Sequence, residues 1–60
     1  HAGRHRRLSA GICELKIDYG PGYRVYYTER QGELIILLAG GDKSSQQTDI
    51  ETAIALARSL

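Results

Sequence analysis

The chain has 60 residues and a formal net charge of +1, which is enough for one small domain near the lower size limit for independent folding. Its single cysteine, Cys13, excludes an internal disulfide and a thiolate zinc site. Its longest apolar run, residues 34–39, is too short to cross a bilayer. We therefore expect a cytoplasmic protein that contacts no membrane and binds no metal or cofactor.

Basic residues are concentrated in residues 1–8. This segment holds Arg4, Arg6 and Arg7, whereas residues 9–60 carry five basic and seven acidic side chains. A basic arm of this kind can bind an anionic partner such as RNA or an acidic peptide, which makes Arg6 and Arg7 candidate RNA-binding residues. The alternative is a solvated, partly disordered terminus.

Two strands with alternating polarity follow the arm. Residues 12–19 place Cys13, Leu15 and Ile17 on one face and Glu14 and Lys16 on the other, the period of a half-buried strand. Gly20-Pro21-Gly22 then has the composition of a type II turn. Residues 23–29 form the second strand: we expect Tyr23, Val25 and Tyr27 to face the core and Arg24 and Tyr26 to face solvent.

The third strand and a helix complete the chain. Arg30-Gln31-Gly32 closes a second hairpin, with Gly32 at positive φ. Residues 33–39 are apolar on both faces, with Leu34, Ile36 and Leu38 on one face and Ile35, Leu37 and Ala39 on the other. Two overlapping capping boxes, Ser44 with Gln47 and Thr48 with Glu51, precede apolar residues at helical spacing. We predict one α+β domain over residues 1–60, with a three-stranded antiparallel meander over 12–39 and a helix over 45–60.

Three cations in this layout are unexpected on stability grounds. Lys16 and Arg24 lie on one face of adjacent strands, where like charges repel. Lys43 precedes a helix N-terminus, where a cation is unfavourable, and with Gly40-Gly41 and the free helix N–H groups it resembles an anion cradle. We predict that the three converge on a phosphate. The alternative is a surface ion-pair ladder beside a solvated lysine.

Tyr26 shares a face with Arg24 and is a candidate for stacking on an RNA base. An exposed tyrosine on a strand is common, so the alternative is a plain surface residue. Cys13 falls on the apolar face of its strand, which is typical of an inert, buried thiol.

Residues 14–27, ELKIDYGPGYRVYY, and residues 40–50, GGDKSSQQTDI, resemble one branch of the RelE/ParE superfamily. These are the addiction-module killer proteins of the phage Gp49-like or HigB-like type. The resemblance runs from about Gly3 to Leu60. It implies that the chain is the C-terminal portion of a RelE-like toxin and lacks that fold's N-terminal strand and two helices.

The resemblance implies ribosome-dependent cleavage of mRNA, in which the ribose 2′-hydroxyl attacks the adjacent phosphate. Lys16 would act as base or electrostatic stabiliser, Arg24 would clamp the phosphate, and Lys43 would stabilise charge on the transition state. The implied partners are a cognate antitoxin, the ribosome and mRNA.

Two departures from the mRNA-cleaving relatives leave other functions open. Glu14 stands where those relatives have a basic residue, and residues 48–60 contain no tyrosine. The chain could instead be a non-catalytic binding toxin, like the ParE relatives that inhibit DNA gyrase, or an inert fragment that only binds antitoxin or pairs with itself. The two apolar faces of residues 33–39 predict a homodimer through the sheet, or a cover supplied by the N-terminal segment.

Overall fold

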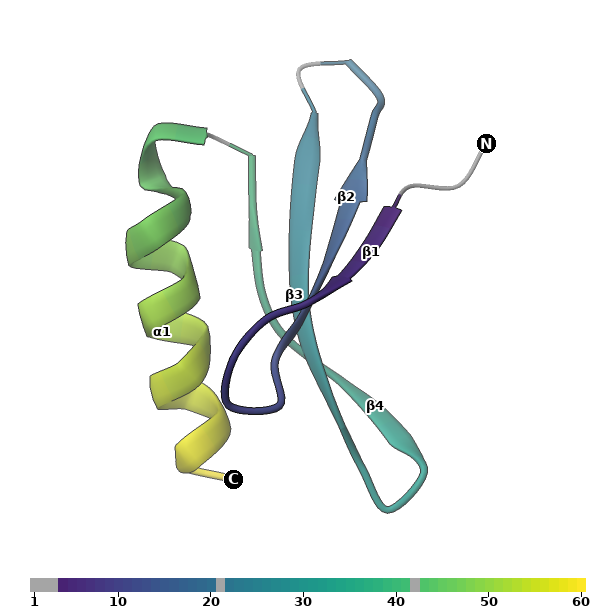
Figure 1. Ribbon diagram of the computed structural model, residues 1–60, viewed down its shortest axis with the longest axis vertical. Coiled ribbons are helices and arrows are strands. Elements are labelled where there is room, and N and C mark those ends of the chain that lie inside the picture. The colour runs from purple at the N-terminus through teal and green to yellow at the C-terminus, as the bar shows by residue number, and fades with distance from the viewer. Residues whose placement is uncertain (1–3, 21, 42) are drawn as a thin grey trace.

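Four antiparallel strands and one helix make up the computed structural model, which describes residues 4–20, 22–41 and 43–60 (Figure 1). The strands lie in sequence order as a meander. A short 3₁₀ turn, η1 (Lys43–Ser45), leads into the helix. The elements are β1 (Arg4–Arg7), β2 (Cys13–Ile17), β3 (Tyr23–Arg30), β4 (Glu33–Gly40) and α1 (Gln46–Arg58). The α+β class is as predicted, and the number of strands is four instead of three.

The extra strand is the basic segment, so the alternative of a disordered arm is wrong for Arg4–Arg7. β1 pairs with β2 in the register Arg4↔Lys16 to Arg7↔Cys13. The turn between them is closed by the Leu8 amide, which donates to the Ile12 carbonyl at 2.8 Å. Ala10 and Gly11 provide its two positive φ angles, 58° and 75°. The sequence of β1 has no apolar alternation, which is why pattern analysis missed it.

The two later hairpins turn where glycine was expected. Gln31 and Gly32 have φ of 52° and 80°, the signs that a two-residue type I′ loop needs. At the hairpin between β2 and β3, Gly22 has φ of 89° and its amide donates to the Tyr19 carbonyl at 3.0 Å. Pro21, on which the type II assignment depended, lies outside the described residues.

The helix begins one residue later than predicted, and its N-cap is not the first residue of either predicted capping box. Its N-cap is Ser45, whose side chain makes no capping hydrogen bond to the backbone and instead donates to Asp49 at 3.1 Å. The Asp49 carboxylate stands in the first turn, where the macrodipole favours an anion. At the other end Arg30 donates to the Ala57 carbonyl at 2.9 Å, a favourable cation at the C-terminus. No helix in the described part of the chain is long and apolar enough to cross a membrane.

The helix covers the sheet face opposite to the one predicted. Tyr26 and Ile12 are fully buried with Ala53 and Ala57. In the described part of the chain, the predicted core face, which carries Leu15 and Val25, has no helix against it. The large apolar side chains exposed on this open face include Tyr23 at 45%, Leu34 at 59% and Ile36 at 60%. The expectation that Tyr23 and Tyr27 point into the core was therefore wrong.

A bulge in β4 explains how the helix finds apolar partners on that side. Tyr26 pairs with Leu38 and Tyr27 with Ile36, so Leu37 is an extra residue in the ladder. Both Leu37 and Leu38 pack against the core. The strict alternation predicted for residues 33–39 is broken at this point.

Candidate functional site

A hollow of about 450 Å³ opens on the helix-bearing side of the sheet, beside the first residue of α1. Its lining is dominated by cations. The residues around it are Arg4, His5, Arg6, Glu14, Lys16, Arg24, Lys43 and Gln46.

Strand register brings the three predicted cations together. Lys16 lies across the β2–β3 ladder from Arg24. Arg24 in turn lies across from Gly40, the last residue of β4, so the chain leaves the sheet beside Arg24 and places Lys43 at the same hollow. Like charges this close raise the free energy of the empty site and favour an anionic ligand.

Arg6 and Arg7 are separated by the alternation of β1. Arg6 faces Glu14 across the strand pair and lines the hollow. Arg7 lies opposite Cys13, on the other face, where it borders a second hollow with Tyr27 and Glu29. The structure therefore brings Arg6, but not Arg7, to the three cations. Arg4, which was not a candidate, also lines this hollow.

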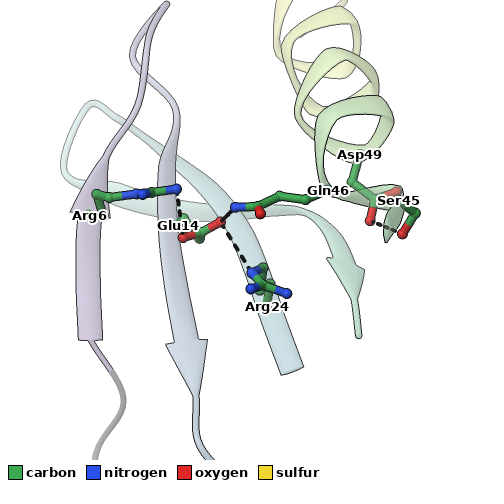
Figure 2. Close-up of polar contacts among 6 residues, drawn as sticks. All are labelled: Arg6, Glu14, Arg24, Ser45, Gln46 and Asp49. Atoms are coloured by element: carbon green, nitrogen blue, oxygen red, sulfur yellow. Dashed lines mark hydrogen bonds and ion pairs between the residues drawn. The ribbon is translucent and has the colours of Figure 1, made fainter. Parts of the chain in front are cut away.

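Glu14 is the anion at the centre of the site (Figure 2). Its side chain is only 6% exposed. Oε1 lies 3.3 Å from Nη2 of Arg6, and Oε2 lies 3.7 Å from Nε of Arg24. Oε2 also accepts a 2.9 Å hydrogen bond from Gln46 of α1. The buried carboxylate thus contacts side chains from three elements, β1, β3 and α1.

Sequence reasoning gave Glu14 and Gln46 too small a role. Glu14 was expected to be one member of a surface ladder, and its place between two arginines followed from β1, which was not recognised as a strand. Gln46 gives no signal in the sequence, because its contact with Glu14 depends on the angle at which the helix meets the sheet.

Arg24 is a half-buried arginine and not the exposed surface residue that was expected. Its side chain is 13% exposed. Nε is buried and makes no hydrogen bond within the described residues, because the Glu14 oxygen at 3.7 Å is beyond hydrogen-bond distance. A buried N–H without an acceptor is costly, so Arg24 has unused capacity for an acceptor such as a phosphate oxygen.

Tyr26 cannot stack on a base in this structure, because its ring is fully buried beneath α1. The expectation of an exposed ring was wrong. Its hydroxyl is also buried and makes no hydrogen bond of ordinary geometry within the described residues, and Glu14 is the acceptor near enough to influence it. Burial raises the pKa of Tyr26, and the negative charge of Glu14 raises it further. The residue serves as packing beneath the site.

Among the described residues, the hollow is lined by five cationic side chains of lysine and arginine and by one carboxylate. The ring of His5 is directed elsewhere, since Nδ1 is 2.8 Å from the Tyr27 hydroxyl on the opposite face. Among the described side chains, those left to act on a ligand are lysines, arginines, Glu14 and Gln46. Such a set can bind a phosphodiester and stabilise additional negative charge on it.

Comparison with known proteins places these features in a family. The family described as "Phage derived protein Gp49-like (DUF891)" matches residues 2–60. A protein of Haemophilus influenzae, described as uncharacterized, is 52% identical over 58 residues, which is 97% of this chain and 59% of that protein. The chain thus spans about three fifths of this relative. No solved structure matches.

Proposed function

Because the chain belongs to the phage-derived Gp49-like family, a family of RelE/HigB-like toxins, we propose that it acts as the toxin of a type II toxin–antitoxin system. The activity we propose is ribosome-dependent cleavage of mRNA. Its partners are a cognate antitoxin, the ribosome and mRNA.

The observation that carries this proposal is the hollow in which Lys16, Arg24 and Lys43 meet. In-line attack by a ribose 2′-hydroxyl adds negative charge to the phosphate, and cations fixed around it stabilise that charge more than they stabilise the substrate. The 2′-oxygen bonds to phosphorus as the bond from phosphorus to the 5′-oxygen breaks, which leaves a cyclic phosphate, and water protonates the leaving 5′-oxygen. Lys16 acts as base for the 2′-hydroxyl proton or as electrostatic stabiliser. Arg24 holds the phosphate oxygens, and Lys43 faces the developing charge. Arg6 contacts the RNA backbone beside them.

A binding-only toxin is the second candidate, and two observations favour it. Helix α1 contains no histidine or tyrosine, and the ring of His5 bonds to Tyr27 instead of facing the hollow. A toxin of this kind, such as a ParE-like gyrase inhibitor, needs no proton transfer, and here the same cations would hold its partner.

Growth arrest by the full-length protein tests the proposal. Lys16→Ala, Arg24→Lys and Lys43→Ala should each relieve the arrest, while co-purification with antitoxin persists. Arg24→Lys keeps the charge and loses the planar fork, which separates clamping from charge alone. Arg58→Ala is the matched control, because Arg58 is exposed in the last turn of α1. Arrest that survives all three changes would remove this hollow from the mechanism.

Arg6 and Arg7 offer a second matched pair, since they are neighbours on β1 that face opposite sides of the sheet. Arg6→Ala should weaken the binding of single-stranded RNA. It should also make the slope of log K against log salt shallower, by the amount expected for about one phosphate contact. Arg7→Ala should change both less. An equal loss in both variants would mean that the arginines of β1 act through general charge.

A further inference from the structure

The Glu14 carboxylate occupies the place in the hollow where an anionic ligand would find the most donors. Arg6, Arg24 and Gln46 all approach it from different elements (Figure 2). Such an arrangement resembles a bound anion with its ligands, except that the anion belongs to the chain.

The carboxylate satisfies this group of donors incompletely. Among the described residues, its hydrogen bond of ordinary length comes from Gln46, at 2.9 Å. Nε of Arg24 and the hydroxyl of Tyr26 remain buried without a hydrogen-bond partner in the described chain. An RNA phosphodiester carries the same single charge as a carboxylate, but it is not tethered to β2. Its oxygens can therefore approach Nε of Arg24 more closely than the Glu14 oxygen, which stays 3.7 Å away, and can accept from the arginine fork through two oxygens at once.

We propose that Glu14 is an internal competitor of the RNA phosphate: it holds Arg6 and Arg24 in place while the site is empty, and it must yield them when a phosphodiester binds. The inference rests on the proposed function, because it concerns the same hollow and the same ligand class. It assigns Glu14 a positioning role that limits affinity.

The test removes the charge of Glu14 and keeps its shape. Glu14→Gln retains an oxygen that can accept from Gln46. The probes are inorganic phosphate and a single-stranded RNA oligonucleotide whose 2′-hydroxyls are methylated so that it cannot be cleaved. We expect Glu14→Gln to bind both probes about tenfold more tightly, near the low end of the coupling measured between close charge pairs.

Salt dependence separates competition from general charge. Once freed, the two arginines can neutralise one more RNA phosphate and release its counterions. The slope of log K against log salt for RNA should therefore steepen by about 0.7. Glu29→Gln is the matched control: it makes the same change in net charge at an exposed residue of β3 that borders the second hollow. It should leave the slope unchanged.

Unchanged or weaker binding by folded Glu14→Gln would overturn the inference. If the wild type still bound RNA through Arg24 and Lys16, the proposed function would stand. If neither protein bound RNA, both would fall. If Glu14→Gln does not fold, the inference is tested on the wild type by NMR during a titration with phosphate. The Glu14 carboxyl carbon and the Arg24 Nε–H should shift with one Kd, and a Glu14 signal that stays still while Arg24 shifts would overturn the inference.

Discussion

The buried hydroxyl of Tyr26 makes an unusual stability prediction: removing it should stabilise the protein. The ring is fully buried, and the hydroxyl has no hydrogen-bond partner among the described residues. An unsatisfied buried polar group costs about 1–3 kcal/mol, because folding strips its water without replacement. Tyr26→Phe removes that cost and preserves the packing of the ring. We expect the free energy of unfolding to rise by about 1 kcal/mol, which raises Tm by about 4–8 °C in a domain of this size.

Thermal and urea unfolding at equal protein concentrations measure this difference. The control is Tyr19→Phe, because Tyr19 is 78% exposed and its hydroxyl stays in water, so the change should lie within about 0.5 kcal/mol. A loss of stability in Tyr26→Phe larger than that of the control would refute the reasoning. It would mean that the hydroxyl donates to Glu14 in solution.

Three further predictions follow from the packing. The pKa of Tyr26 is raised in the folded protein, so the unfolded chain loses this proton first and the free energy of unfolding should fall as pH rises above about 10. Tyr26→Phe should flatten that fall. Identical alkaline stability profiles for the two proteins would contradict this prediction. Gly40→Ala would place Cβ 2.5 Å from the Asp49 carboxylate and should lower the free energy of unfolding by about 1 kcal/mol. Gly41→Ala, whose Cβ would have its nearest contact at 3.4 Å, should lower it less. Equal melting temperatures for the two variants would refute the close contact. The open sheet face should drive self-association of this 60-residue chain, so sedimentation should show dimers that Ile36→Lys dissociates, and a compact wild-type monomer at high concentration would count against that interface.

The strand pattern predicted which residues share a face, and this was enough to bring Lys16, Arg24 and Lys43 to one hollow. It did not predict which face the helix covers. The face with Leu15 and Val25 is the more apolar in sequence, yet the helix packs on Tyr26 and on the leucines at the bulge. A bulge shifts the alternation by one residue, and period-two reasoning cannot detect it.

The charged centre of the site was only partly predictable for a related reason. Arg6 and Glu14 meet through the pairing of β1 with β2, and a run of arginine and histidine gives no strand signal. Burial of Arg24 and Glu14 depends on that strand and on Gln46. Local patterns identified the cations, whereas the tertiary contacts determined that the cations enclose a carboxylate.

Cleavage of mRNA in cells tests the central claim most directly. The 5′ ends of cellular transcripts can be mapped by primer extension after expression of the full-length gene. The account predicts discrete new ends in translated regions with the wild type and with Arg58→Ala, and their loss with Lys16→Ala and Arg24→Lys. Growth arrest by the wild type without any new ends would contradict it and favour a toxin that only binds its target.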